Sequence, residues 1–442
     1  MDFFEAARGY FPARRHVRIG VTGLRRSGKT SLLTSLAVNL LAMGRGTPAL
    51  PALSEALSGR SLRVAIAPAG AASMPRFDPV AKSMSLAADP PAWPTPTDAV
   101  SLLVLDLDIG HAGLGRHLPD QLLRLEFLDY PGEWLLDLPL LGQNFAAWSD
   151  ATLRRLEHRA EAAEFLRFVH GLPAQVAASE DLAASGHALY AESLRALQQA
   201  GLSLLQPGRF LMPEPGAAAP WIQFFPVLGT SPLARLMSAR FEAYLAAVGR
   251  SLSEPGFARI DRLVVVADLL SALHAGPAAF DDAAASLALV SRALARRHPL
   301  PLLPSWLQPW GIGRIAFAAT KSDHVASRQR ANLAGLMAQL APAPDNAVWR
   351  SFAIAAINCT EDFVWTLDGR PVSAVRGHVA GQGSVRSYPG EVPNQKPSRA
   401  DWAHQFLALP DFSPKRLAAG GRGTIPQLEL DRLLLFLLED ML

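Results

Sequence analysis

The sequence predicts an α/β protein with a three-layer sheet core, a large helical insertion and a small C-terminal extension made of a β-hairpin and a terminal helix. Three observations predict this fold. Short apolar runs of strand length recur early and late in the chain. A glycine-rich turn joins the first of these runs to a helical pattern, and an alanine-rich helical stretch separates the early runs from the later ones. At 442 residues the chain is also too long for one compact core without insertions.

The first half of the core begins with a buried strand expected at residues 16–22, directly before the glycine-rich turn. A helix is expected at residues 31–43, where leucines recur at helical spacing. Residues 44–98 lack strong periodicity, so we expect a long, largely irregular connection with one short strand at 62–66. Apolar and polar residues then alternate over residues 100–109, which predicts a half-buried strand.

The remaining elements complete this arrangement. A turn at residues 113–119 is expected to lead into a neighbouring strand at 122–128, and the alanine-rich residues 145–257 are typical of an all-helical subdomain or lid. The later elements are strands at 263–267, 315–319 and 352–356, a helix at 283–297, a β-hairpin or small sheet at 362–390 and a terminal helix at 427–442. Four segments follow: two parts of the core (1–140 and 258–361), the helical insertion (141–257) and the C-terminal extension (362–442).

Composition and charge exclude several classes of protein. Half of the residues are hydrophobic, which excludes a disordered chain. The net charge of +3 comes from arginines spread singly along the chain rather than from a basic stripe, so no nucleic-acid partner is expected. A single cysteine, Cys359, favours a reducing compartment. Residues 1–5 carry acids where a signal peptide carries basic residues, and no apolar run reaches the about 18 residues that span a bilayer, so a cytoplasmic protein is expected.

The glycine-rich turn reads Gly23-Leu24-Arg25-Arg26-Ser27-Gly28-Lys29-Thr30. A strand before it and a helix after it provide the context that the Gly-x4-Gly-Lys-Ser/Thr pattern of P-loop NTPases requires. The backbone N–H groups of such a turn cradle phosphates at the positive end of the helix dipole. Lys29 is expected to reach the β- and γ-phosphates, and the Thr30 hydroxyl to ligate Mg²⁺. The expected nucleotide-binding set also includes Gly23, Arg26, Ser27, Gly28 and Ser31.

A second motif, Asp129-Tyr130-Pro131-Gly132, follows the strand expected at 122–128. An acidic residue at the end of an apolar strand matches the element that holds Mg²⁺ in P-loop NTPases, directly or through water. Gly132 then gives the Asp-x-x-Gly spacing, in which a backbone N–H can meet the γ-phosphate and sense its loss. The alternative is an ordinary turn, because Pro-Gly pairs are common in turns.

The third motif, Thr320-Lys321-Ser322-Asp323, follows the apolar strand expected at 315–319 and fits the Asn/Thr-Lys-x-Asp pattern of guanine-specific NTPases. An ionised carboxylate only accepts hydrogen bonds, so Asp323 suits the N1–H and 2-amino donors of guanine, which adenine lacks. The stem of Lys321 is expected to pack over the base, with its ammonium facing the phosphate-loop carbonyls. The alternative is that Asp323 caps the following helix.

Together these segments resemble bacterial P-loop GTPases, and more closely the YcjX-like family of stress-associated proteins. The stretches that carry the resemblance are Gly23–Thr30, Asp89-Pro90-Pro91-Ala92-Trp93-Pro94, Leu128–Leu140 and Thr320–Asp323. The resemblance implies GTP and GDP binding with Mg²⁺, a nucleotide-switched conformation and a role in envelope or heat stress. It also implies a candidate membrane-protein partner, and with it a peripheral place at the inner membrane. Nothing in the sequence indicates the oligomeric state.

The resemblance also suggests residues outside the three motifs. In GTPases a threonine before the second core strand closes on Mg²⁺, and Thr97 is the best match here, with Thr95 second. A backbone N–H after the last sheet strand meets guanine O6, which places Ile357 in the site, although Ala356-Ile357-Asn358 departs from the usual Ser-Ala-Lys.

Turnover is expected to be slow, because Glu133 stands where many GTPases have the glutamine that orients the attacking water. Its carboxylate can accept a proton from water but is repelled by three phosphates. Two interpretations of Arg25 and Arg26 are equally open: one acts as an arginine finger in cis, or both face solvent. Two rival functions remain, namely an ATP-dependent P-loop enzyme, against which Lys321 and Asp323 argue, and a GTP-binding scaffold without turnover.

Overall fold

The computed structural model describes residues 15–24, 26–68, 74–95, 100–111, 120–212, 223–253, 260–295, 312–341, 347–398, 400–403, 409–418 and 423–442. The chain divides into two compact units. The first comprises Met1–Tyr130, Arg259–Gly276 and Gly311–Leu442, and the second comprises Pro131–Ala258 and Pro277–Trp310. No helix within these described stretches has both the length and the apolar character needed to cross a membrane.

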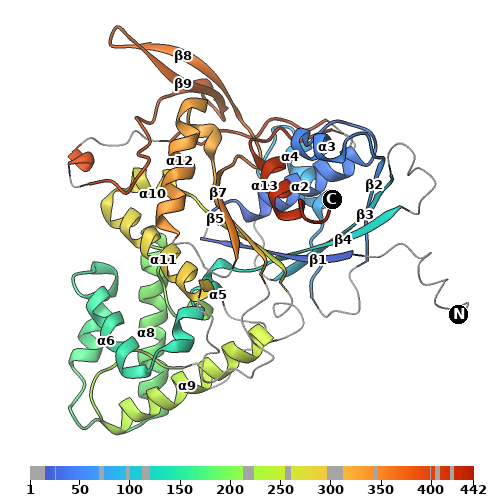
Figure 1. The fold of residues 1–442 in the computed structure, drawn as a ribbon. Coiled ribbons are helices and arrows are strands. Elements are labelled where there is room, and N and C mark those ends of the chain that lie inside the picture. The colour runs from blue at the N-terminus through green and yellow to red at the C-terminus, as the bar shows by residue number, and fades with distance from the viewer. Residues whose placement is uncertain are drawn as a thin grey trace, which may run out of the picture. The chain divides into compact units, whose positions relative to one another are not determined.

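The first unit is built on a seven-stranded sheet in the order β2-β3-β4-β1-β5-β6-β7 (Figure 1). Its strands are β1 (Arg15–Gly23), β2 (Leu62–Ile66), β3 (Ser101–Ile109), β4 (Gln121–Asp129), β5 (Arg262–Ala267), β6 (Arg314–Ala319) and β7 (Val348–Ala353). β4, β1, β5, β6 and β7 run parallel, and β3 pairs antiparallel with β2 and with β4. The valine-rich run of β5 is buried throughout, as expected for a central parallel strand covered on both faces.

Helices cover both faces of this sheet (Figure 1). The leucines of α2 (Lys29–Met43), α3 (Pro51–Leu57) and α13 (Leu430–Leu438) share one hydrophobic core with β1, β3 and β4. α12 (Ser327–Leu340) packs on β6 and β7, and its buried leucines lie outside that core, so it covers the opposite face. The helix–sheet–helix layering confirms the predicted three-layer P-loop NTPase core.

The chain between α2 and β3 is more ordered than the sequence predicts. The strand at residues 62–66 is confirmed as β2, but α3 and α4 (Pro79–Ala87) also form there, so the expectation of a largely irregular connection was wrong. Both helices begin with proline, which is preorganised for a first helical turn. Asp78 caps α4 by accepting the backbone N–H groups of Val80 and Ala81, each at 3.0 Å. Helices this short show no clear periodicity in a sequence.

Three other elements are shifted from their predicted positions. β7 ends at Ala353 rather than at residue 356, because Ala355 pairs with Leu428 instead. α13 begins at Leu430 rather than 427, since the residue before it, Glu429, takes the left-handed conformation with φ of +58°. The helix predicted at 283–297 is α11 (Pro277–Ala295). The turn predicted at 113–119 lies outside the described residues.

A small three-stranded sheet confirms the predicted C-terminal extension. β8 (Thr360–Leu367), β9 (Arg370–Val379) and β10 (Gly383–Ser387) are antiparallel in the order β10-β9-β8. Gly369, in the turn between β8 and β9, has φ of +75°, a conformation that favours glycine. A second hydrophobic core joins β9 to the segment after β7, and its members include Val375, Val379, Ile357, Cys359, Phe412 and Ile425.

The second unit is helical. Its elements are α5 (Gly132–Leu135), α6 (Phe145–Leu156), α7 (Ala163–His170), α8 (Glu180–Gln199), α9 (Pro232–Ser253) and α11. An aromatic core holds it together, in which Trp148 stacks on Phe241 with ring centroids 5.0 Å apart. The predicted insertion, residues 141–257, falls entirely within this unit, which also takes in 131–140 and 277–310.

Candidate nucleotide-binding site

The glycine-rich turn leaves β1 and enters α2 with the geometry of a phosphate loop. Leu24 donates its N–H to the Val266 carbonyl of β5 at 3.0 Å. Gly23 lies so close to that strand that a Cβ there would be 2.0 Å from the same carbonyl oxygen. Gly28 has φ of +85° and is the residue from which α2 starts. Only glycine fits both places without strain, so the motif encodes the bend that lets backbone N–H groups converge.

The side chains of the loop are arranged around its lysine. The Lys29 ammonium donates to the Gly23 carbonyl oxygen at 3.1 Å and is partly buried. Ser27 is buried, and within the described part of the chain its hydroxyl has no hydrogen-bond partner. Thr30 and Ser31 are half-buried in the first turn of α2, and Arg26 is exposed with φ of +57°. Arg25 lies outside the described residues, so its predicted role stays a prediction.

Asp129 is brought to the same edge of the sheet. It is the last residue of β4, it is buried, and it pairs in register with Val21 two residues before the end of β1. Of the two candidate switch threonines, Thr97 lies outside the described residues. The backbone and hydroxyl oxygens of Thr95 accept hydrogen bonds from the Lys82 ammonium at 2.7 and 2.9 Å.

The chain passes into the second unit between Tyr130 and Pro131. Within that unit, Gly132 opens α5 and is buried, while Glu133 is half-buried in the same short helix. The assignment of Asp129, Gly132 and Glu133 to one site therefore rests only on their spacing in the sequence, and it stays a prediction.

The Thr320–Asp323 motif is fixed by hydrogen bonds to three segments of the first unit. The N–H of Thr320 donates to the Ala267 carbonyl of β5 at 2.9 Å, and Ser322 donates to the Ile354 carbonyl at 3.1 Å. Asp323 is buried, and its Oδ2 accepts the N–H of Cys359 at 2.9 Å. These hydrogen bonds anchor the motif at the end of β6.

The alternative interpretation of Asp323 as a helix cap was wrong. The residue belongs to a short 3₁₀ turn, Ser322–His324, and the N-cap position of α12 is occupied by Ala326, which offers no side-chain acceptor. Asp362, from β8, supplies the acceptor instead, because its Oδ1 receives the N–H of Ser327 at 3.0 Å.

The segment after β7, where a contact to guanine O6 is predicted, is shaped by the C-terminal tail. Ala355 donates to the Leu428 carbonyl at 3.1 Å and Asn358 donates to the Pro426 carbonyl at 2.7 Å. Among the described residues the N–H of Ile357 makes no hydrogen bond. The tail also reaches α2, since the buried Asn39 amide exchanges two hydrogen bonds with the backbone of residue 425, at 2.9 and 3.0 Å. The sequence analysis did not predict this contact. The feature that pointed to it is Asn39, a polar residue among the leucines of α2.

Lys321 differs from its predicted orientation. Its ammonium was expected to face the phosphate-loop carbonyls, but it pairs with the Asp268 carboxylate, with Nζ and Oδ2 2.6 Å apart. Its Nζ also lies 3.3 Å from the Ser271 hydroxyl. Both partners lie just after β5, and the sequence motifs include neither of them.

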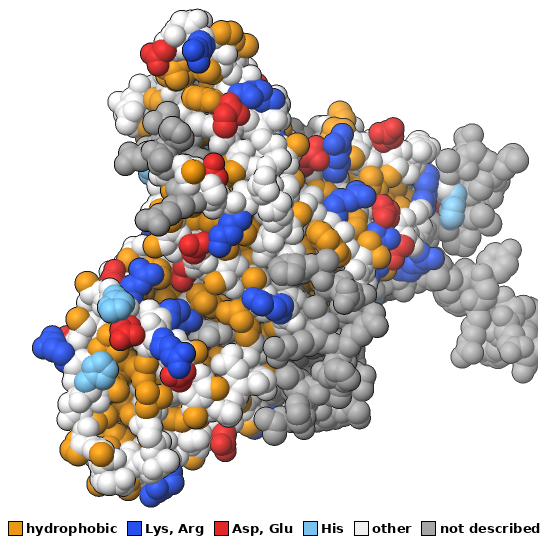
Figure 2. Space-filling view, turned by 60° about the vertical axis from the view of Figure 1, so that its left-hand side comes forward, with side chains coloured by type: hydrophobic (Ala, Val, Ile, Leu, Met, Phe, Trp, Pro, Cys, Tyr) orange, Lys and Arg blue, Asp and Glu red, His pale blue; other side chains and the backbone are white. Residues whose placement is uncertain are grey.

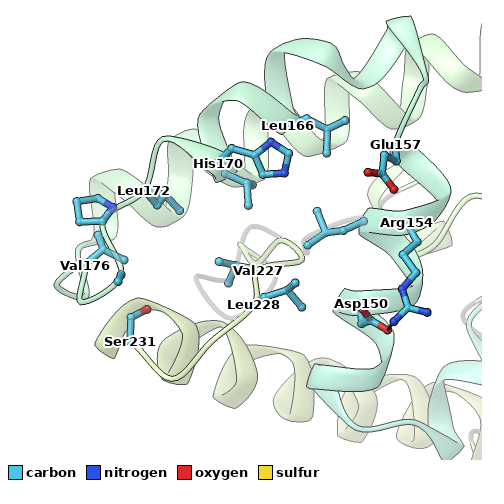
Figure 3. Close-up of a pocket in the computed structure, with 14 residues that line it drawn as sticks. Asp150, Arg154, Glu157, Leu166, His170, Leu172, Val176, Val227, Leu228 and Ser231 are labelled. Atoms are coloured by element: carbon cyan, nitrogen blue, oxygen red, sulfur yellow. Dashed lines mark ion pairs between the residues drawn. The ribbon is translucent and has the colours of Figure 1, made fainter.

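The described residues also border two cavities. One, of about 630 Å³, is bordered by β9, by residues 413–416 and by the Cys359 side chain. The other, of about 330 Å³, lies in the helical unit, with Leu228 on its apolar side and the Asp150–Arg154 ion pair at its rim (Figure 3). Figure 2 shows hydrophobic side chains gathered on the surface of this helical part, with charged and histidine side chains around them. Neither cavity is lined by a residue of the three motifs.

The sheet order, the phosphate loop between β1 and α2, and the two motifs at the ends of β4 and β6 place this chain among proteins with the P-loop NTPase fold. The sequence profile of the YcjX-like family, DUF463, matches residues 17–442, and the chain belongs to that family. It is 35% identical to the "Ras-like GTPase YcjX" of Escherichia coli K12 over 97% of this chain and 96% of that protein. It is 29% identical to the "Ras-like GTPase YcjX" of Shewanella oneidensis over 97% of this chain and 95% of that protein. These findings confirm the family resemblance that the motifs indicated.

Proposed function

We propose that this protein binds guanine nucleotides with Mg²⁺ at the carboxyl edge of its sheet and hydrolyses GTP to GDP, acting as a slow nucleotide-dependent switch. One observation carries the proposal. The phosphate loop and the base motif bind consecutive carbonyls of β5, through Leu24 to Val266 and through Thr320 to Ala267. The two loops therefore flank the end of one strand, where open α/β sheets bind their ligands.

The donors at this edge fit the nucleotide and its metal ion. Lys29 and the N–H groups of the phosphate loop suit the β- and γ-phosphates, and the Thr30 hydroxyl and Asp129 carboxylate are the oxygen ligands that Mg²⁺ prefers. When bound, the ion neutralises charge on the phosphate oxygens. Asp323 offers the acceptor for guanine, and the unengaged N–H of Ile357 offers the donor for O6. Thr97 enters the proposal through the family resemblance alone.

Hydrolysis is the second part of the proposal. It is supported by the two relatives, each of which is named a Ras-like GTPase. Glu133 in place of glutamine supports a slow rate, because a carboxylate beside the γ-phosphate is repelled by it. Arg26 is exposed, which is compatible with a finger that approaches the phosphates and equally with the alternative that it faces solvent.

The cellular part of the proposal rests on the family resemblance. It places the switch in a bacterial stress response, in the cytoplasm or peripherally at the inner membrane, with a membrane protein as partner. The GTP-binding scaffold without turnover and the ATP-dependent enzyme remain the alternatives.

A nucleotide panel tests the proposal. Calorimetry with GDP and ADP, with and without Mg²⁺, should show selective GDP binding, and a preference for ADP would reject the guanine assignment. Phosphate release from GTP should exceed that of a Lys29→Ala variant, while the exposed Lys396→Ala control should behave as the unmodified protein does. Equal release from the unmodified protein and Lys29→Ala, with GDP binding retained, would establish the scaffold alternative.

A further inference from the structure

The ammonium of Lys321 is held by an acidic side chain that belongs to none of the three motifs. Asp268 is the first residue after β5, and its side chain is only 10% exposed, against 42% for that of Lys321. The parallel register pairs Ala267 with Ala319, which sets Asp268 beside the start of the base motif. The contact is thus built into the sheet rather than made by two mobile surface chains.

The carboxylate of Asp268 is itself fixed. It is the N-cap of α10 (Leu269–Ala275), where its Oδ1 accepts the N–H of Ser271 at 2.9 Å. Its Oδ2 accepts the Ser271 hydroxyl at 2.5 Å and lies 2.6 Å from the Lys321 ammonium. A carboxylate oriented by two local donors presents its remaining acceptor in one direction, so the ammonium that it attracts is confined as well.

The backbone of Lys321 is constrained at the other end of the side chain. Its φ is +59°, a left-handed conformation that is uncommon for a non-glycine residue. With the backbone set by the turn and the ammonium set by Asp268, the four methylene groups between them have a defined path. Such a stem covers apolar surface while its charged end stays with a partner.

We propose that Asp268 is a positioning residue for guanine-nucleotide binding, which acts by holding Lys321 so that its stem can pack on the purine ring. The inference rests on the proposed function of the site. It assigns a specificity role to a residue after β5 that no sequence motif marks. The competing explanation is that Asp268 only caps α10 and that its contact with Lys321 has no consequence for the nucleotide.

Asp268→Asn separates these explanations, because asparagine is as good an N-cap as aspartate but carries no charge to hold an ammonium. We expect GDP affinity to fall by about tenfold, within the range of coupling between contacting residues. Lys321→Met keeps an apolar stem and removes the ammonium. In that background Asp268→Asn should change GDP affinity less than about twofold, since there is nothing left for it to position.

The control is Asp106→Asn, which removes the charge of a half-buried carboxylate that pairs with Arg124 at 2.7 Å in the middle of β3. It should leave GDP affinity unchanged, and thermal unfolding should show that all variants are folded. An equal loss from Asp268→Asn in both backgrounds, or no loss in either, overturns the proposal in favour of a capping role. Absence of GDP binding by the unmodified protein would instead reject the proposed function itself.

Discussion

Replacing Asp323 by asparagine should move the nucleotide preference from guanine toward xanthine. In the proposed site the carboxylate would accept two donors from guanine, N1–H and the 2-amino group, whereas a carboxamide presents one acceptor and one donor. Xanthine carries an oxygen at position 2, so it can accept the new N–H. The substitution therefore inverts one donor–acceptor relation and leaves the size of the side chain unchanged.

The surroundings of Asp323 determine how much GDP affinity the substitution should remove. Asp323 is 3% exposed, and its Oδ2 already accepts the N–H of Cys359 at 2.9 Å. An asparagine Oδ1 can keep that bond, so the turn should stay in place. What is lost is one charge-assisted contact to the base, which contributes about 1.5–3 kcal/mol. GDP affinity should therefore fall by about 10- to 100-fold.

The assay is calorimetric titration with GDP and XDP in the presence of Mg²⁺. Asp362→Asn is the matched control, because Asp362 lies beside the motif and caps α12 but does not belong to the proposed binding set. It should bind GDP as the unmodified protein does. If Asp323→Asn retains its GDP affinity and gains none for XDP, the carboxylate does not read the base, and the guanine assignment is wrong.

Three further predictions follow from single contacts. Gly23→Ala should abolish GDP binding, because the new Cβ would lie 2.0 Å from the Val266 carbonyl oxygen. Denaturant titrations should also show the free energy of unfolding lowered by about 2–4 kcal/mol. Normal GDP binding by this variant would contradict the prediction. Asp137→Ala should destabilise the helical unit by about 3–5 kcal/mol, because it removes the carboxylate that lies 3.2 Å from the buried guanidinium of Arg209. A thermal unfolding transition at the unchanged temperature would refute this prediction. Burial lowers the pKa of His324, so the imidazole binds a proton more weakly in the folded state than in the unfolded chain. The free energy of unfolding should therefore fall as the pH drops below about 6.5, and it should fall less in His324→Gln. Identical pH profiles of unfolding for the two proteins would show that His324 does not contribute.

Much of the fold and the phosphate site could be predicted because their determinants are local. Gly23 and Gly28 stand at the two places where the backbone must approach β5 closely or turn left-handed, and no other residue type fits both. Buried parallel strands also leave continuous apolar runs in the sequence, so β5 and β6 were found within one residue of their observed starts. Where the local backbone conformation permits only one residue type, the structure at that position can be predicted from the sequence.

Contacts between distant segments could not be predicted in this way. An aspartate after a strand is common, and nothing local distinguishes Asp268 as the partner of Lys321, which lies fifty-three residues later in the chain. The N-terminus of α12 shows the same difficulty. Asp323 lies four residues before that helix and was considered as its cap, but the N–H of Ser327 is accepted by Asp362, which comes from β8. Asp268 reaches Lys321 through the register of β5 and β6, and Asp362 reaches α12 through the packing of the small sheet, so both partners depend on the whole fold.

The tail after residue 422 shows how far such non-local contacts reach into the proposed site. A base loop that contacts guanine O6 needs an N–H group that the protein does not already use. Ala355 and Asn358, on either side of Ile357, donate to the carbonyls of Leu428 and Pro426. Buried N–H groups almost always have an acceptor, and among the described residues that of Ile357 has none, which is the arrangement that the proposed contact to guanine O6 requires. The proposed guanine site therefore depends on backbone carbonyls at residues 426 and 428, even though all three motifs lie before residue 324.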